Sequence, residues 1–342
     1  MKVSELGEFG LIDLLTEMTS QLKVATAPAG QNLILGIGDD TAAWQSDGLT
    51  QLLTVDSMIE DVHFSLAITP WYELGWKALA VNLSDIAAMG GTAQYAVVSL
   101  AVPASTEVDN VSNLYQGMIE LAEESGVVIV GGDTTSAPLV MISVTVLGTV
   151  GQHPLKSQGK NLLTRSGARA GDKIAVTGYL GAASAGMAML TEKLKFDTAA
   201  TSHLREAFLR PRPRLTEGQI LREQGIECAI DISDGLVSDL NHICRASRLS
   251  ARIEVDQLPI HPDVKVNLGT RALELALSGG EDYELLFTGS NDSISRIKKT
   301  IPCPITIIGE MLADTKRQIT LIDRQGNPVK LSSQGWEHFT RA

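Results

Sequence analysis

Apolar residues along the chain recur with two spacings, one typical of amphipathic helices and the other of β-strands. Up to residue 150 the two patterns alternate. The predicted helices there cover 5–22, 71–89 and 113–124, and Gly126 is the expected C-terminal cap of the last. The predicted strands cover 33–35, 52–55, 95–102, 127–130 and 139–150. This order indicates a first domain at 1–150.

The segment 151–172 is polar and Gly-rich, which indicates a domain boundary. Beyond it the predicted strands cover 173–177, 229–232, 285–288, 305–309 and 318–322, and the predicted helices cover 182–194 and 235–246. A stiff Arg-Pro-Arg-Pro-Arg connector occupies 210–214. Hairpin-like strand pairs occur beside alternating strands and helices. The pattern therefore favours an α+β protein with a second domain at 151–342.

Composition narrows the functional classes. The chain has 342 residues, of which 44% are hydrophobic and 20% charged, so a disordered or coiled-coil protein is excluded. Its 28 basic and 40 acidic residues give a net charge of −12, and it has no dense Lys/Arg run, which argues against nucleic-acid binding. Three widely spaced cysteines indicate neither a disulfide framework nor a zinc ribbon.

Two segments without charged residues, 86–106 and 134–155, are long enough to suggest membrane spans. Both contain Pro, Gly and several Ser or Thr, and the second alternates apolar and hydroxyl residues as a strand does. We interpret them as buried sheet. The first residues lack an apolar signal sequence, so we expect a cytoplasmic protein without a membrane partner.

Aspartates gather at the predicted ends of strands. Six occupy such positions: Asp39, Asp40, Asp56, Asp133, Asp231 and Asp234. A single Asp in this place is usually a turn former or a helix cap, and Asp234 by itself fits that role. Binding sites, however, are commonly built from loops at strand ends, and several of these Asp residues have Gly beside them. The recurrence predicts one acidic site.

Asp85 lies in the predicted helix 71–89, which is apolar on most sides, and Asn82 shares its face. A buried carboxylate must be paired, hydrogen-bonded or metal-bound. Lys77, two helical turns earlier, is one candidate partner, and a divalent cation shared with the other aspartates is the alternative. Converging carboxylates favour Mg²⁺, which also bridges phosphates. The six histidines are scattered, and their spacing predicts no zinc site.

Common phosphate-binding motifs are absent from the sequence. Gly159-Lys160 lacks the glycine spacing of a P-loop, and neither the protein-kinase motifs nor a GxGxxG after a strand occurs. A phosphate-handling enzyme with this sequence must therefore have another fold.

Seven segments, in order and spanning nearly the whole chain, resemble the thiamine-monophosphate kinase family. They are 36–40, 55–57 with His63, 82–90, 131–135, 163–168, 231–236 and 278–285. The Asn-Leu-Ser-Asp of 82–85 and the Ser-Gly-Gly-Glu-Asp-Tyr-Glu-Leu of 278–285 favour this family over the related aminoimidazole ribonucleotide synthetases and selenophosphate synthetases. The resemblance implies two α/β domains, a homodimer whose N-terminal sheets pair, and a nucleotide site between the domains.

The resemblance also implies the ligands: ATP, several Mg²⁺ ions and thiamine monophosphate. The implied metal positions are Asp40, Thr54, Asp56, Asp85, Asp133, Asp231 and Asp234. The implied nucleotide positions are Gly132, Asp133, Arg165, Ser233 and Tyr115. The implied substrate positions are His63, Glu281 and Trp336. Val55 departs from a hydroxyl residue common in relatives, so a metal contact there would use its backbone carbonyl.

The chemistry agrees with a metal-assisted kinase. A phosphate acceptor with a second pKa of about 6 is already ionised at neutral pH, so direct in-line transfer needs no general base. Two alternatives stay open: a related ATP-dependent synthetase, and a non-catalytic Mg²⁺-nucleotide sensor. Each proposed ligand also has a structural reading, namely a tail contact for Trp336, an exposed loop acid for Glu281, a structural histidine for His63 and a surface ion pair for Arg165.

Overall fold

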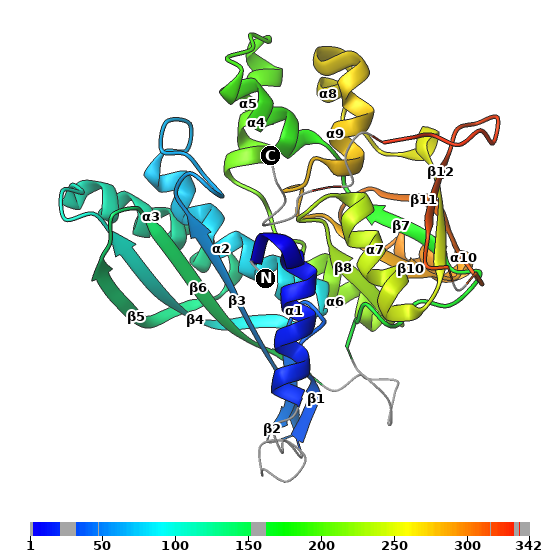
Figure 1. The fold of residues 1–342 in the computed structure, drawn as a ribbon, viewed down its shortest axis with the longest axis horizontal. Coiled ribbons are helices and arrows are strands. Elements are labelled where there is room, and N and C mark those ends of the chain that lie inside the picture. The colour runs from blue at the N-terminus through cyan, green and yellow to red at the C-terminus, as the bar shows by residue number, and fades with distance from the viewer. Residues whose placement is uncertain are drawn as a thin grey trace.

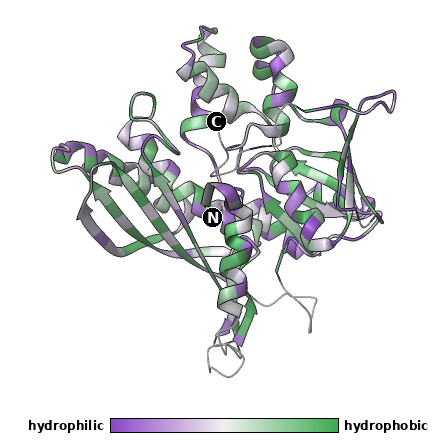
Figure 2. Cartoon of the chain, in the orientation of Figure 1, coloured by the Kyte–Doolittle hydropathy of each residue, from purple (hydrophilic) through white to green (hydrophobic). Residues whose placement is uncertain are grey.

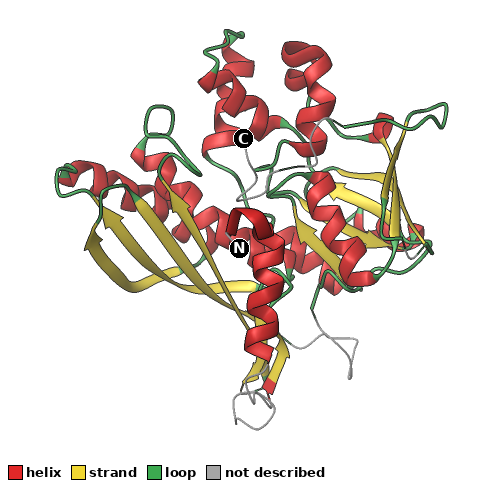
Figure 3. Ribbon diagram, viewed as in Figure 1, coloured by secondary structure: helices red, strands yellow, loops and turns green. Residues whose placement is uncertain are grey.

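The computed structural model describes residues 3–20, 32–46, 48–151, 162–314, 316–331 and 335. Two six-stranded sheets lie side by side, with helices between and around them (Figures 1 and 3). Among the described residues, no helix combines the length and apolar character that crossing a membrane requires.

The first sheet has the strand order β1-β2-β3-β6-β4-β5, in which only β4 and β5 are parallel neighbours. The elements of this half are α1 (Val3–Ser20), β1 (Leu33–Leu35), β2 (Ala42–Ser46), β3 (Leu49–Ile59), α2 (Trp71–Ala88), β4 (Thr92–Val102), α3 (Val108–Ser125), β5 (Val128–Ser136) and β6 (Met141–Val150). Alternate residues of β4 and β6 are buried, as expected of a sheet with one covered face. Hydrophobic positions run along its strands in Figure 2.

Helices α2 and α3 approach closely because each has a glycine at the contact. A Cβ on Gly75 would lie 1.8 Å from the carbonyl oxygen of Leu114, and a Cβ on Gly117 would lie 1.9 Å from that of Tyr72. No side chain fits at either place. The two glycines therefore fix how tightly α2, which carries Asp85, is held against α3.

The second sheet has the order β12-β9-β11-β7-β10-β8, and its only parallel pair is β12 with β9. The elements of this half are β7 (Lys173–Thr177), α4 (Ala182–Thr191), α5 (Thr198–Leu209), α6 (Leu215–Glu223), β8 (Cys228–Asp231), α7 (Leu236–Ser247), β9 (Ser250–Glu254), α8 (Pro262–Leu268), α9 (Ala272–Ser278), β10 (Leu285–Gly289), α10 (Asn291–Ile297), β11 (Ile305–Leu312) and β12 (Ile319–Ile322), with short 3₁₀ turns η3 (Val255–Gln257) and η4 (Gly269–Arg271). Both mixed sheets agree with the expected α+β class.

Helix α2 belongs to the cores of both halves. Its Leu79, Leu83 and Ile86 pack in the core of the first sheet. Its last turn, at Ala87 and Ala88, packs with Leu285 and other residues of the second half. Because both sides of the helix are covered, its sequence is apolar nearly all round. The polar residues that it retains must therefore have a specific purpose.

The connector at 210–214 packs against the first half. The Trp76 indole nitrogen donates to the carbonyl oxygen of Pro211 at 2.9 Å, and the Arg210 guanidinium lies 4.3 Å from the centre of the Trp76 ring. Arg210 also pairs with Glu120 of α3. These contacts tie the second half to α2 and α3.

Two predicted strand ends were wrong, and both bear on the site. The strand expected at 52–55 runs from Leu49 to Ile59, so Asp56 lies inside it, and the strand expected at 127–130 runs through Asp133 to Ser136. In both places hydrogen bonding to a neighbouring strand continues through polar or glycine residues that a hydrophobic pattern marks as an end.

Other predictions differed in extent or were incomplete. Helix α3 begins at Val108 instead of residue 113, and α4 ends at Thr191 instead of residue 194. The sequence analysis also missed seven elements: β2, α5, α6, β9, α8, α9 and α10. Most of these are short, and short elements carry too few periods for their pattern to stand out.

Candidate active site

A cleft of about 490 Å³ opens between the two halves of the molecule. Its walls come from β3, α2, the loops around Asp40 and Arg165, the end of β8 and the loop 279–283. Glu8 of α1 also lines it, and α1 crosses in front of α2 in the view of Figure 1. The cleft is therefore assembled from segments spread over nearly the whole chain.

Three aspartates from different elements converge at this cleft. Asp40 follows β1, Asp85 lies in α2, and Asp231 ends β8; each offers a carboxylate oxygen, and these three oxygens lie within 4.8 Å of one another. The Thr54 hydroxyl donates to Asp85 Oδ2 at 2.5 Å, and the Ser84 hydroxyl donates to Asp231 Oδ2 at 2.6 Å. The two hydroxyls orient the carboxylates but cannot neutralise them.

The cluster is short of positive charge. Burial, followed by the charges of Asp56, Asp231 and Asp40, raises the pKa of Asp85 well above its usual range. Burial and then the charge of Asp40 raise the pKa of Asp231 to about 7. Carboxylates held this close without a cation therefore tend to retain protons.

At Asp40 only one of the two carboxylate oxygens has a partner among the described residues. Its Oδ1 accepts from Arg165, whose Nη2 lies at 2.5 Å and whose Nε lies at 3.2 Å. Its Oδ2 is buried and has no hydrogen-bond partner among the described residues. An unsatisfied buried carboxylate oxygen beside two others fits a hard divalent cation, whose preferred ligands are oxygens.

Arg165 links the loops on both sides of the cleft. Besides the ion pair with Asp40, its backbone N–H lies 3.3 Å from both carboxylate oxygens of Asp39. Burial, and then the charge of Asp40, raises the pKa of Asp39 to about 7. Arg165 is thus part of the cleft, and the alternative of a surface ion pair does not hold.

Glu281 pairs across the cleft with Lys77 of α2, with 2.8 Å between Nζ and Oε1. The Lys77 side chain is only 2% exposed and its ammonium lies 4.1 Å from the centre of the Phe208 ring. The sequence analysis offered Lys77 as a partner for Asp85; the helix instead directs it to Glu281. Glu281 has a left-handed backbone (φ 59°), and its N–H donates to the carbonyl oxygen of Ser233 at 2.7 Å. This strained loop lies against the loop after β8.

His63 lines the cleft at the end of β3. Its Nδ1 accepts from the backbone N–H of Ile59 at 3.1 Å. In the neutral ring the proton is therefore on Nε2, which makes that nitrogen a hydrogen-bond donor.

The comparisons with known proteins agree with this arrangement. The family model "AIR synthase related protein, N-terminal domain" matches residues 38–150, and "AIR synthase related protein, C-terminal domain" matches residues 169–322. The chain is 38% identical to the thiamine-monophosphate kinase of Bacillus subtilis, over 89% of this chain and 93% of the relative. It is 39% identical to that of Escherichia coli K12, over 89% and 92%.

The chain belongs to the thiamine-monophosphate kinase family.

A solved structure described as AaThiL complexed with AMPPCP and TMP matches with a TM-score of 0.84 at 32% identity, over 99% of both chains. The two-domain fold of the AIR-synthase type that the sequence predicted is thereby confirmed.

Most of the residues that the resemblance implied lie in the cleft. They are Asp40, Thr54, Asp56, Asp85, Asp231, Asp234, Arg165, Ser233, His63 and Glu281. Val55 lines the cleft as well. Trp336 falls outside the residues that the structure describes.

Gly132, Asp133 and Tyr115 do not line the cleft of a single chain. Asp133 lies opposite Ser99 of β4, and the register continues through Ser143 of β6 to Ser57 of β3. Three spacings of about 4.8 Å separate β5 from β3, so Asp133 is about 14 Å from the nearest strand of the cleft. Tyr115, on α3, packs against the first core.

Three further polar residues of α2 support the site. Ser84 holds Asp231, Lys77 holds Glu281, and the Asn82 side-chain oxygen accepts from the backbone N–H of Asp56 at 2.9 Å. The sequence analysis named Asn82 and Lys77 without these partners and gave no role to Ser84. All three share one signal in the sequence: a polar residue within an otherwise apolar helix. Burying such a residue is costly unless it has a buried partner.

Proposed function

We propose that this chain catalyses transfer of the γ-phosphoryl group of ATP to the phosphate of thiamine monophosphate, giving thiamine diphosphate and ADP. The observation that carries the proposal is the cluster of Asp40, Asp85 and Asp231, with its unsatisfied buried oxygen, in the cleft of a thiamine-monophosphate kinase family member. The relative with AMPPCP, an ATP analogue, and TMP bound supports ATP as co-substrate.

In this proposal Mg²⁺ is held by the three clustered aspartates together with Thr54, Asp56 and Asp234. Bound there, Mg²⁺ would neutralise the phosphate charges that otherwise repel the incoming acceptor. The fit rests on the acidic donor set and on the raised pKa values of Asp85 and Asp231. Val55 would contribute only a backbone oxygen.

The chain's own residues bind and orient the two substrates. We assign Arg165 and Ser233 to the nucleotide phosphates, His63 Nε2–H to the acceptor phosphate, and Glu281 and Trp336 to the thiamine rings. The acceptor oxygen is ionised at neutral pH because its pKa is about 6. A general base is therefore unnecessary, and positioning for in-line transfer is the main task.

We further propose a homodimer that pairs through the uncovered face of the first sheet. Apolar side chains on that face are exposed: Leu53, Val55, Tyr95, Val97, Val128, Val130 and Met141. The register places Leu53, Leu147, Tyr95 and Val128 in one row across four strands. A continuous apolar row of this kind favours a second copy of the same sheet.

The dimer would also explain Asp133. Asp133 is exposed on β5, about 14 Å from its own cleft, so we infer that it and Gly132 complete the nucleotide site of the partner chain. In this division residues 1–150 bind metal and nucleotide and dimerise, and residues 151–342 complete the ATP and substrate site. A cytoplasmic location stays a prediction.

Product chromatography tests the reaction. With ATP and Mg²⁺, thiamine monophosphate should yield thiamine diphosphate. Free thiamine should stay unreacted because this proposal commits the clustered aspartates to the metal and His63 to the acceptor phosphate, which leaves no base assigned to ionise an alcohol. ATP turnover without a thiamine acceptor would favour a synthetase, and nucleotide binding without turnover would favour a sensor. Rapid phosphorylation of free thiamine would refute the proposed acceptor.

Mixing two inactive variants tests the shared site. Asp85→Asn and Asp133→Asn chains, refolded together, should recover about a quarter of wild-type activity, since half of the dimers are mixed and each has one intact site. The two variants should be inactive when kept apart. If light scattering gives a monomer, or if the mixture stays inactive although mixed dimers form, the trans role of Asp133 is wrong while the proposed reaction stands.

A further inference from the structure

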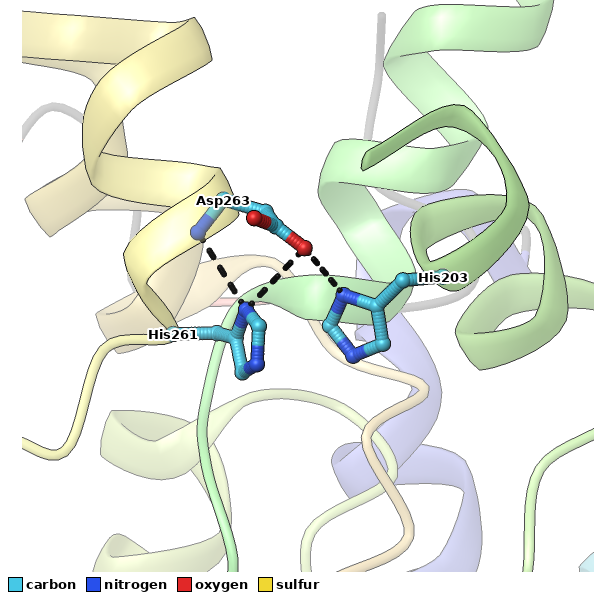
Figure 4. A group of neighbouring side chains, drawn as sticks. All are labelled: His203, His261 and Asp263. Carbon is cyan, nitrogen blue, oxygen red and sulfur yellow. Dashed lines mark hydrogen bonds and ion pairs between the residues drawn. The ribbon is translucent and has the colours of Figure 1, made fainter. Parts of the chain in front are cut away.

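Two histidines and an aspartate come together in the second half, away from the cleft. His203 of α5 faces His261 and Asp263 at the start of α8 (Figure 4). His203 Nδ1 lies 2.9 Å from Asp263 Oδ2, and His261 Nδ1 lies 3.5 Å from the same oxygen. None of the three residues lines the cleft.

The two imidazole rings are close to each other as well as to the carboxylate. Their centroids are 3.9 Å apart with the planes tilted by 39°. The Tyr179 ring stands edge-on to His261 at 5.1 Å. The three ligand atoms, one from each residue, lie within 4.8 Å of one another. One potential ligand atom from each of the three residues thus already lies in the same neighbourhood.

Hydrogen bonds leave this arrangement incomplete. His261 Nδ1 accepts from the backbone N–H of Asp263 at 3.2 Å, so its lone pair is engaged in a long hydrogen bond that a bound metal would replace. His203 Nδ1 is buried and, despite its approach to Asp263, has no hydrogen-bond partner of acceptable geometry among the described residues. A neutral imidazole is the form that binds a metal.

We propose that His203, His261 and Asp263 form a binding site for a divalent transition metal such as Zn²⁺. With bonds of about 2.0–2.1 Å, ligand atoms around a tetrahedral zinc are about 3.3 Å apart. The observed 2.9 and 3.5 Å bracket that spacing. Two histidines and one carboxylate, with the remaining position open to water, form a donor set that Zn²⁺ takes readily and Mg²⁺ does not.

The metal would clamp α5 to α8. Arg205, two residues after His203, pairs with Glu73 of α2 at 3.5 Å, so α5 also contacts the first half. The chain leaves α8 through α9 to the loop 279–283 that lines the cleft. The site is therefore structural in this proposal, stabilising the helices behind the substrate loop without touching the reacting groups.

Zinc titration by calorimetry tests the site in the full-length chain. The protein is stripped with a chelator and returned to a buffer with excess Mg²⁺, which competes for the carboxylate cleft. Wild type should bind one Zn²⁺ that His203→Gln or Asp263→Asn binds at least about 100-fold more weakly, because each variant loses one of three ligands. His261→Asn should weaken binding equally while keeping a side-chain acceptor at the start of α8.

His242→Gln is the matched control. His242 lies in a separate group with Asp234 and Asp239, and its variant should keep the zinc affinity of wild type at the proposed site. Zn²⁺ should also raise the melting temperature of wild type and of His242→Gln but not that of His203→Gln. The proposal is overturned if wild type binds no Zn²⁺, or if the three ligand variants bind it as wild type does. Circular dichroism checks that each variant is folded.

Discussion

The buried ion pair between Lys77 and Glu281 predicts an asymmetric response to mutation. Lys77 is 2% exposed and Glu281 is 27% exposed, so the two residues differ in how well water can replace the lost partner. Glu281→Gln leaves a buried ammonium without a counter-charge, beside a neutral amide oxygen and the Phe208 ring. Lys77→Met leaves a carboxylate that the cleft can hydrate.

The expected losses in the free energy of unfolding follow from this difference in exposure. Removing one partner of a fully buried pair costs about 3–5 kcal/mol because the other charge stays buried and unpaired. We expect about 3 kcal/mol for Glu281→Gln, where the cation–π contact offsets part of the loss. For Lys77→Met we expect about 1–2 kcal/mol, since the remaining charge is partly solvated. The double variant has no stranded charge and should be more stable than Glu281→Gln alone.

Urea unfolding followed by circular dichroism measures these free energies through the midpoint and slope of the transition. Glu310→Gln is the matched control for Glu281→Gln. Glu310 lies 2.8 Å from Lys173 Nζ, the same distance as in the buried pair, but the lysine left behind is 35% exposed instead of 2%. That variant should lose less than about 1 kcal/mol. Equal losses for Lys77→Met and Glu281→Gln, or a loss for Glu310→Gln as large as that for Glu281→Gln, would refute the argument from burial.

Three more predictions concern the metal cluster and the packing of α2. Burial and the charge of Asp40 raise the pKa of Asp231 to about 7, so the metal-free protein should lose stability as the pH rises from about 4 to 7. Melting curves should show this loss, and Mg²⁺ should reduce it. Asp85→Asn should abolish turnover and the rise in melting temperature that Mg²⁺ causes. It should not lower the stability of the Mg²⁺-free protein. An undiminished Mg²⁺ effect on the melting temperature would contradict the metal assignment. Gly75→Ala should cost at least about 2 kcal/mol in urea unfolding because a Cβ there meets backbone at 1.8 Å, whereas Gly151→Ala, with nothing within 4 Å, should be neutral.

The sequence by itself determined the character of the site. Aspartates beside glycines and a polar Asn-Leu-Ser-Asp step in an apolar helix placed Asp40, Asp85 and Asp231 in one acidic, phosphate-handling centre, and the three do converge. The prediction of this site succeeded because burying a charge is costly. A carboxylate in an apolar helix therefore indicates a binding role from the neighbouring sequence alone. Strand β6 was found because one covered face imposes a regular period over many residues, and α2 was found from its long run of apolar residues closed by glycines.

Only the tertiary structure decided which of these residues contact one another. Asp56 and Asp133 lie within strands because neighbouring strands continue the hydrogen bonding past the apolar run, and the register then puts Asp133 far from its own cleft. Lys77 reaches Glu281, and His203 meets His261, across separations of 204 and 58 residues that no spacing rule covers. Local periodicity assigns a residue to a face, but which faces meet depends on the packing of the whole chain.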